Sequence, residues 1–283
     1  MGKVECGRSG HALMVLDGET RVIAIIGDPI AQVKSPGGVT AALAARGRNA
    51  VVIPVHVSVP DVDTFVRGFS CARNGDGILV TVPHKFAAYR HCTTATPRAH
   101  LLGAVNVMRR NADGSWHGDQ LDGAGFVDGV RAAGGEPSGR RALMAGAGGA
   151  GSAIALALLD AGVSAMAIHD DDPRRRDALV EKLRDAHGER AAVGSVDPTG
   201  FSLVVNATPA GMRAADPLPF DIGKLAADMF VGDVITRPAV TPLIAAARAS
   251  GCMTQVGGGM FDAVSKLLVD FLLASPAHPG DGR

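Results

Sequence analysis

A glycine-rich segment in the middle of the chain has the spacing of a dinucleotide-binding loop. Gly146, Gly148 and Gly151 satisfy G-x-G-x-x-G, directly after a predicted strand and directly before a predicted helix. The first glycine permits a tight turn, the second lets the backbone approach a pyrophosphate, and the third lets helix and strand pack closely. The helix amino terminus then faces the negative charge. We predict cofactor contacts from these three glycines, Gly149 and Ala150.

An acidic cluster downstream supports this interpretation over the alternative of an ordinary turn in a chain with 37 glycines. Asp170 stands 19 residues beyond Gly151, at the end of the next predicted strand. A dinucleotide fold presents a carboxylate to the adenosine ribose at about this spacing. The three carboxylates of Asp170, Asp171 and Asp172 would repel the 2′-phosphate of NADP. We therefore predict that the cofactor is NAD and that Asp170 and Asp171 contact it. NADP stays possible because an arginine among residues 174–176 can bind a phosphate.

Strand-like and helix-like segments alternate around this loop, a pattern typical of βαβ units and a parallel sheet. In the second half, the predicted strands are Arg141 to Ala145, Ala165 to Ile168, Leu203 to Asn206, Phe230 to Ile235 and Met253 to Val256. The predicted helices there are Gly125 to Ala133, Gly149 to Ala161, Pro173 to Asp185, Thr241 to Ser250 and Met260 to Leu273. This periodicity indicates a doubly wound domain.

The first half repeats the alternation and ends in a hairpin. Its predicted strands are Val22 to Ile26, Ala50 to Val57, Gly77 to Val82, and the hairpin strands Val105 to Arg109 and Ser115 to Gly118. One helix is predicted to begin with Ser35 as N-cap and Pro36 as its first residue, and to end near Gly47. A second helix follows Pro60, with Val62, Phe65, Val66 and Phe69 on one apolar face.

These elements predict an α/β protein with two domains. Residues 20–122 form the first α/β domain and residues 123–258 a Rossmann-type doubly wound domain. The last helix, within residues 259–275, is predicted to return and pack on the first domain. We read Met1 to Gly10 as a loose amino terminus.

Composition favours a packed protein that acts on small molecules. Hydrophobic residues make up 47% of the 283 residues, and the 28 Lys and Arg balance the 28 Asp and Glu. No net charge draws the chain to nucleic acid or to an anionic membrane. The apolar runs are shorter than the ~20 residues of a membrane helix, so we expect a cytoplasmic protein. The four cysteines and nine histidines lack ligand spacing, so we expect no metal site and no disulfide framework.

Several short segments, in order and between about Arg21 and Leu273, resemble the shikimate dehydrogenase family. They are Gly27-Asp28-Pro29-Ile30 with Lys34-Ser35-Pro36, Val80-Thr81-Val82-Pro83-His84-Lys85, Leu102-Gly103-Ala104-Val105-Asn106, Gly118 with Asp122-Gly123, Asn206-Ala207-Thr208-Pro209-Ala210-Gly211-Met212, and Thr241-Pro242-Leu243. Any one of these segments can arise by chance, whereas their joint order is specific.

The resemblance implies the catalytic and binding residues of a dehydrogenase. Lys85 and Asp122 would be the catalytic pair, in which the lysine holds the reacting hydroxyl and passes on its proton while the aspartate orients the ammonium. Without the resemblance both are ordinary solvated charges. Further cofactor contacts would come from Asn206, Thr208, Pro209, Met212 and Gly257.

Substrate contacts would come from Ser35, Thr81 and Asn106. Each also has a structural alternative: Ser35 can cap a helix, Thr81 can simply favour the strand, and Asn106 can stabilise a turn. The chain departs from the family at several pocket positions. Val33 replaces a serine, Leu79 an asparagine, Gln120-Leu121 an Asn-Thr pair, Thr236 a tyrosine and Val264 a glutamine.

These departures predict a less polar pocket, in which shikimate is a poor substrate and quinate or a less hydroxylated relative is preferred. The alternative is that Gln32, Lys34 or Gln255 restores ordinary shikimate binding.

Three functional hypotheses follow. The leading one is a dehydrogenase of cyclic hydroxy acids such as shikimate or quinate, acting in aromatic amino acid biosynthesis as a monomer or homodimer. The second is a methylenetetrahydrofolate dehydrogenase-like enzyme with a Lys and Asp pair. The third is a non-catalytic protein that senses NAD or a metabolite, which the presence of both Lys85 and Asp122 disfavours.

Overall fold

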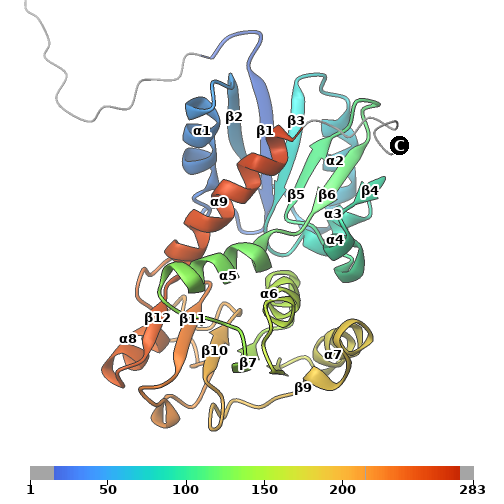
Figure 1. Cartoon of the computed structure of the whole chain (residues 1–283). Helices are drawn as coiled ribbons and strands as arrows, with labels where there is room; N and C mark the ends of the chain where they lie inside the picture. The colour runs from blue at the N-terminus through green and yellow to red at the C-terminus, as the bar shows by residue number, and fades with distance from the viewer. Residues whose placement is uncertain (1–15, 214, 275–283) are drawn as a thin grey trace, which may run out of the picture.

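The computed structural model describes residues 16–213 and 215–274, which form two six-stranded sheets with helices packed around them (Figure 1). The amino-terminal segment Met1 to Gly10 and the last residue of the predicted returning helix segment, 275, lie outside the described residues. The α/β class predicted from the sequence is confirmed. The exact domain limits stay a prediction.

The first sheet has the order β2-β1-β3-β5-β6-β4. Its strands are β1 (Arg21–Gly27), β2 (Ala50–His56), β3 (Gly75–Val80), β4 (Thr94–Ala95), β5 (Val107–Arg110) and β6 (Trp116–Asp119). β1, β2 and β3 are parallel, while β5 is antiparallel to both β3 and β6. Because of these directions, the carboxyl ends of β3 and β6 and the amino end of β5 meet at one edge.

Four helices flank this sheet: α1 (Ser35–Ala45), α2 (Val62–Ser70), α3 (Lys85–Tyr89) and α4 (Pro97–Leu102). The expectation that Ser35 is the N-cap of α1 is wrong. Lys34 occupies that position and Ser35 is the first helical residue, which makes Pro36 the second. The amides of the first helical residues lack intrahelical partners, so the second position tolerates a proline as well as the first does.

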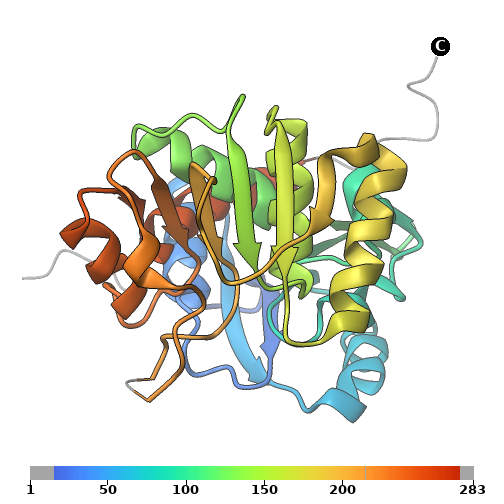
Figure 2. The ribbon, with the colours of Figure 1, turned by 90° about the horizontal axis from the view of Figure 1, so that it is seen from below.

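The second sheet is entirely parallel, with the order β12-β11-β10-β7-β8-β9. Its strands are β7 (Arg141–Ala145), β8 (Ala165–His169), β9 (Ala191–Val193), β10 (Leu203–Asn206), β11 (Phe230–Asp233) and β12 (Met253–Gln255). Its helices include α6 (Gly149–Asp160), α7 (Pro173–His187) and α8 (Pro242–Ala249). Figure 2 shows these strands side by side, with α7 at one end and α8 at the other.

The strand order reverses between β7 and β10, because β8 and β9 lie on one side of β7 and β10 to β12 on the other. In open α/β sheets, ligands bind outside the carboxyl ends of the strands at such a switch point. The glycine-rich segment follows β7 at this position. The Rossmann-type topology therefore places the loop where a dinucleotide fold needs it.

Helices α5 (Asp122–Ala132) and α9 (Gly257–Leu273) run between the two sheets (Figure 1). They pack closely because α5 carries glycines at its contacts. A Cβ on Gly123 would lie 2.1 Å from the Ala153 carbonyl oxygen of α6, and one on Gly125 would lie 2.2 Å from Val264 of α9. The same helix thus touches both halves of the chain.

The end of α9 returns to the first sheet and to α1, as the sequence predicts. Arg46 forms an ion pair with Asp270 at 3.0 Å, and Arg109 Nη1 donates to the Ala274 carbonyl at 3.1 Å. No helix among residues 16–213 and 215–274 has both the length and the apolar content to cross a membrane.

The sequence misplaced two helix starts and missed several short elements. The last helix was expected from Met260, whereas α9 begins at Gly257. We expected a helix from Gly125, whereas α5 begins at Asp122. Glycine has poor intrinsic helix propensity, so residues 122–125, with the sequence DGAG, are not predicted to be helical. In the structure, close packing against α6 overrides that preference. The short α3, α4, β4 and β9 leave no periodic pattern of sufficient length.

Gln255 provides a test of the packing. It is 2% exposed, and its amide nitrogen and oxygen have no hydrogen-bond partner among the described protein atoms. An unsatisfied buried polar group costs about 1–3 kcal/mol. We expect Gln255→Met, of similar size, to raise the free energy of unfolding by about 1–2 kcal/mol in this range.

Thermal and urea unfolding would measure this effect. Gln120 is the matched control, because it is equally buried and both ends of its amide are hydrogen-bonded. We expect Gln120→Met to destabilise the protein. If Gln255→Met loses as much stability as Gln120→Met, the Gln255 amide must have hydrogen-bond partners, and the interpretation is wrong.

Candidate active site

Lys85 and Asp122 meet at the edge of the first sheet that faces the second half of the chain. Lys85 is the first residue of α3, after β3, and Asp122 is the first residue of α5, after β6. The Lys85 ammonium Nζ donates to Asp122 Oδ2. The two residues are only 9% and 8% exposed. The structure therefore brings together the pair that the resemblance implied, in a site largely withdrawn from water.

Asn106 completes the arrangement around the carboxylate. Its Nδ2 donates to Asp122 Oδ1 at 2.9 Å, and its Oδ1 accepts from the Leu121 N–H at 2.9 Å. It precedes β5, which runs antiparallel to β3, so it reaches the same edge as Lys85. Both carboxylate oxygens of Asp122 are thus engaged by side chains, and the carboxylate has a fixed orientation.

The glycine loop lies directly against the lysine. A Cβ added to Gly149 would lie 2.9 Å from Lys85 Cδ and 3.0 Å from Lys85 Cβ. Gly149 is also the first residue of α6, with Gly148 as its N-cap. The aliphatic stem of the lysine therefore rests on the helix terminus that would hold the cofactor's phosphates.

The loop has the shape that a dinucleotide requires. Gly146 has a φ of 104°, a conformation that favours glycine, and a Cβ on Gly151 would lie 2.0 Å from the Gly146 carbonyl oxygen. A Cβ on Gly148 meets nothing within 4 Å, so the backbone there is open to a ligand. Gly146, Gly148, Gly149, Ala150 and Gly151 fit a bound pyrophosphate.

Asp170 has a role that the sequence did not predict. Its Oδ2 accepts from the Ala147 N–H of the glycine loop at 2.6 Å, and its Oδ1 accepts from the Asp172 N–H at 2.9 Å and from Arg175 Nη2 at 2.6 Å. Burial raises the pKa of Asp170, but the bonds from Arg175, Ala147 and Asp172 outweigh it and hold the pKa below its usual value. Asp170 therefore braces the loop, whereas the neighbouring Asp171 side chain is fully exposed.

The loops after β10 and β11 are tied together by a second buried network, which sequence reasoning missed. Asp233, 0% exposed, accepts from Asn206 Nδ2 at 3.2 Å and from Thr241 Oγ1 at 2.7 Å. Burial raises the pKa of Asp233, although these bonds and one from the Ile235 N–H act against it. Asn206 Oδ1 in turn accepts from the Thr208 N–H at 3.0 Å. The available signal was a carboxylate, Asp233, inside the apolar run Phe230 to Ile235 that was predicted as a strand; the observed strand β11 ends at this residue.

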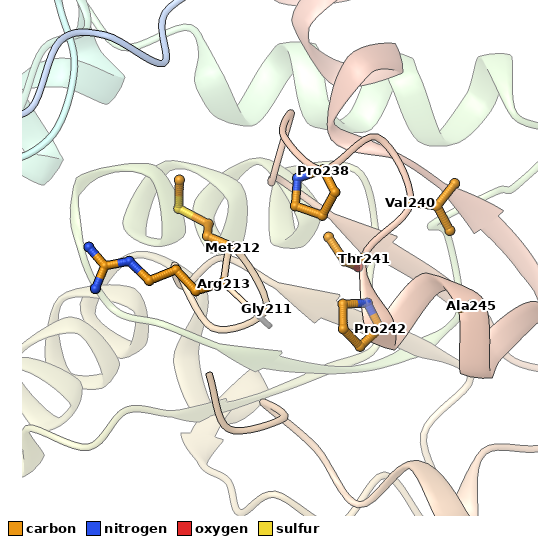
Figure 3. A pocket seen from close by; sticks show the side chains of 8 residues that line it. All are labelled: Gly211, Met212, Arg213, Pro238, Val240, Thr241, Pro242 and Ala245. Carbon is orange, nitrogen blue, oxygen red and sulfur yellow. The ribbon is translucent and has the colours of Figure 1, made fainter. Parts of the chain in front are cut away.

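These two loops border a cavity of about 350 Å³, drawn in Figure 3. It is lined by Gly211, Met212, Arg213, Pro238, Val240, Thr241, Pro242 and Ala245. Met212 is half-exposed at its rim, and Pro209 is exposed in the same loop. Gly257 lies against the start of the loop after β11, since a Cβ on it would be 2.3 Å from the Ile235 carbonyl oxygen. The predicted cofactor residues of the second half thus follow the carboxyl ends of its parallel strands.

The predicted substrate residues lie on separate elements, unlike the Lys85–Asp122 pair. Thr81 packs beside Gly27 at the end of β1, whereas Ser35 and Val33 lie at the start of α1 and Thr236 in the loop after β11. All four are half-buried. Within the described residues, no side-chain hydrogen bond joins Ser35 or Thr236 to the Lys85–Asp122 pair.

The apolar residues at the family's pocket positions belong to the hydrophobic core of the protein. Leu79, Leu121 and Val264 are 2%, 4% and 7% exposed and belong to one hydrophobic cluster, against which Val33 packs. Val264 also contacts Gly125 of α5. These side chains are therefore part of the core rather than isolated substitutions.

Comparisons with known proteins decide the family. A model of the shikimate dehydrogenase substrate binding domain matches residues 25–108. A shikimate dehydrogenase (NADP(+)) from Rubrobacter xylanophilus is 40% identical over 247 residues, covering 86% of this chain and 87% of that relative. This chain belongs to the shikimate dehydrogenase family.

Solved structures of the shikimate dehydrogenase family have the same fold. The quinate dehydrogenase from Corynebacterium glutamicum in complex with NAD is 29% identical with a TM-score of 0.81, over 91% of this chain and 95% of that one. The shikimate 5-dehydrogenase from Listeria monocytogenes in complex with shikimate and NAD is 27% identical with a TM-score of 0.81, over 91% and 93%. The resemblance is confirmed, and the folate dehydrogenase and sensor hypotheses find no support.

The contact between Gly149 and Lys85 generates a prediction. A methyl group on Gly149 would push the Lys85 stem away from Asp122, whereas one on Gly148 would enter the open space left for the cofactor. We expect Gly149→Ala to lower kcat by about tenfold, equivalent to about 1.4 kcal/mol of barrier, with nearly unchanged cofactor affinity.

Gly148→Ala is the matched control, and we expect it to weaken cofactor binding instead. Calorimetry and steady-state kinetics on both variants separate the two effects. A Gly149→Ala enzyme with the kcat of the parent would show that the methyl group is accommodated without moving the lysine.

Proposed function

We propose that this member of the family catalyses reversible hydride transfer between a nicotinamide cofactor and a hydroxyl of a cyclic hydroxy acid. The observation that carries the proposal is the buried Lys85–Asp122 pair, held by Asn106, directly against Gly149 of the dinucleotide loop. This places proton-handling groups beside a cofactor cradle. We also propose, from the family alone, a cytoplasmic location and a role in aromatic amino acid biosynthesis. The proposed assembly is a monomer or homodimer.

In this proposal the chain's residues manage the proton while the bound nicotinamide supplies the hydride chemistry. Lys85 Nζ would hold the oxygen of the reacting hydroxyl and, during oxidation, pass the hydroxyl proton on to solvent water; during reduction it would return a proton from water to the same oxygen. Asp122 fixes the position of Nζ and accepts a hydrogen bond from a substrate hydroxyl. Asn106 keeps the carboxylate from rotating. Thr81 and Ser35 would contact the rest of the substrate, as the family resemblance implies.

The glycine loop and the amino terminus of α6 would hold the pyrophosphate, and the loop from Asn206 to Met212 would border the nicotinamide. For the ribose end we propose a preference for NAD. Asp171 is a fully exposed carboxylate directly after β8. Arg175 is engaged by Asp170 at 2.6 Å and Arg176 by Asp177 at 2.8 Å, so these two guanidinium groups already have anionic partners.

Calorimetry with each cofactor tests this preference. We expect NAD to bind at least about tenfold more tightly than NADP, which is about 1.4 kcal/mol of repulsion between Asp171 and the 2′-phosphate. Asp171→Asn should raise NADP affinity and leave NAD affinity nearly unchanged. Equal or stronger binding of NADP by the unaltered protein would show that an arginine of the 174–176 run overcomes the carboxylates.

For the substrate, the apolar cluster favours a less hydroxylated molecule than shikimate. Val33, Leu79, Leu121 and Val264 supply no hydrogen-bond partner, and a bound hydroxyl or carboxylate that loses a charge-assisted partner loses about 1.5–3 kcal/mol. Gln255 is buried against Gly129 of α5, where a Cβ would lie 2.5 Å from its Nε2. We therefore propose that the reaction is retained while a less hydroxylated cyclic acid is preferred over shikimate. Quinate carries one hydroxyl more than shikimate, so these apolar residues do not favour it.

Steady-state kinetics with shikimate, quinate and a cyclic hydroxy acid that has fewer hydroxyls than shikimate test both the reaction and the preference. We expect the highest kcat/KM for the acid with fewer hydroxyls, and we expect Val33→Ser to improve shikimate by restoring a carboxylate donor. A kcat/KM for shikimate of about 10⁴ M⁻¹s⁻¹ or above in the unaltered enzyme would contradict the preference. Absence of turnover with every cyclic hydroxy acid and both cofactors would contradict the reaction itself.

A further inference from the structure

Gln120 lies between the Lys85–Asp122 pair and the glycine loop. It is 1% exposed. Its Oε1 accepts from the Asp122 N–H at 3.2 Å, and its Nε2 donates to the Gly149 carbonyl oxygen at 3.2 Å. The two ends of a single buried amide are therefore bound to two different parts of the chain.

Both partners of Gln120 are the first residues of helices. Asp122 begins α5 and Gly149 begins α6. The first amides of a helix have no intrahelical acceptor, so Gln120 Oε1 satisfies a group that the helix leaves open. At its other end, Gln120 holds the turn that would cradle the cofactor's phosphates. The side chain thus joins the terminus that carries the reactive carboxylate to the terminus that carries the cofactor.

Few side chains make such a connection. In the part of the chain that the structure describes, two side-chain hydrogen bonds join residues 20–122 to residues 123–258. The second runs from Lys182 Nζ on α7 to the Leu102 carbonyl oxygen at the end of α4, at 3.2 Å. It touches neither the glycine loop nor the Lys85–Asp122 pair. Among the described residues, Gln120 is the one whose side-chain hydrogen bonds link these two groups.

The length of the side chain matters for this link. The family resemblance places an asparagine at this position. An asparagine oxygen readily accepts from the N–H two residues further on, so it would retain the bond to Asp122. It is one methylene shorter, and the bond to Gly149 already spans 3.2 Å from the longer side chain. A glutamine therefore makes a connection that an asparagine does not.

We propose that Gln120 is a positioning residue that transmits cofactor binding at the glycine loop to the first turn of α5. By fixing Gly149 relative to Asp122, it sets the separation between the bound nicotinamide and the Lys85–Asp122 pair. Misplacing reacting groups by about 1 Å can cost about 100-fold in rate, so such a link affects the chemical step. The kinetic consequence rests on the proposed function, whereas the structural coupling does not.

Hydrogen exchange measured with and without saturating NAD or NADP tests the coupling. In the unaltered protein we expect cofactor to slow exchange both at the glycine loop and at the first turn of α5. In Gln120→Asn we expect the loop to remain protected, which shows that cofactor is bound, while most of the protection at α5 is lost. In Gln120→Met, which loses both bonds, the Asp122 amide should also exchange faster without cofactor.

Lys182→Met is the matched control, because it removes the other hydrogen bond between the two halves and leaves Gln120 in place. We expect its α5 protection to match that of the unaltered protein. If Gln120→Asn retains full protection at α5 when the loop is protected, the proposal is wrong. Equal loss of α5 protection in Lys182→Met would also overturn it, because any contact between the halves would then suffice.

Kinetics supply the second readout. We expect Gln120→Asn to lower the single-turnover rate of hydride transfer by about five- to tenfold, with the cofactor Kd within about twofold and a thermal midpoint close to that of the unaltered protein. An unchanged transfer rate would contradict the positioning role. The two proposals can fail separately. If hydrogen exchange behaves as described but neither the unaltered protein nor any variant turns over a cyclic hydroxy acid, the proposed function is wrong and the coupling is supported.

Discussion

The buried ion pair between Lys85 and Asp122 is the interaction on which the arrangement of the molecule depends. Removing a charged group from water costs several kcal/mol unless a partner and further hydrogen bonds compensate it. The two side chains are each 11% exposed, so both must reach the same point with their remaining groups satisfied. Asn106 provides the further hydrogen bond to the carboxylate, from its Nδ2 to Asp122 Oδ1.

The topology of the first sheet follows from this demand. Lys85 and Asp122 are 37 positions apart, and they meet because β5 and β6 fold back as a hairpin beside β3. The antiparallel pairing returns the chain to the edge that β3 has just left. A purely parallel arrangement would need a longer crossover to bring Asp122 to the same place. The hairpin is thus part of the active-site architecture.

The second half must lie against this pair, and small residues make that approach possible. Gly123 lets α5 contact the backbone of α6, and Gly149 leaves room for the Lys85 stem. Larger side chains at either position would separate the cofactor loop from the ion pair. Asp170 and Gln120 then hold the loop, Asp170 by accepting from the Ala147 N–H and Gln120 by donating to the Gly149 carbonyl. Close packing and a few directed hydrogen bonds together determine where the cofactor would sit.

The sequence predicted those features whose cause is local. The glycine loop and the strands β7 and β10 follow from residue type and spacing, and their predicted bounds match the structure. The pairing of Lys85 with Asp122 came only from family resemblance, because nothing local connects them. The inward turn of Asp170 and the bridge through Gln120 depend on contacts 23 and 29 positions apart, which no periodicity reveals. The start of α5 was missed because packing outweighed glycine's poor propensity.

Turnover and cofactor binding by Lys85→Ala together test the central claim most directly. The lysine would act on the substrate proton, and its headgroup binds Asp122 rather than the glycine loop. We therefore expect turnover to fall below detection while calorimetry gives a nearly unchanged cofactor Kd, which also shows that the fold is intact. Turnover within about tenfold of the unaltered enzyme, or about 1.4 kcal/mol of barrier, would contradict the role assigned to the pair.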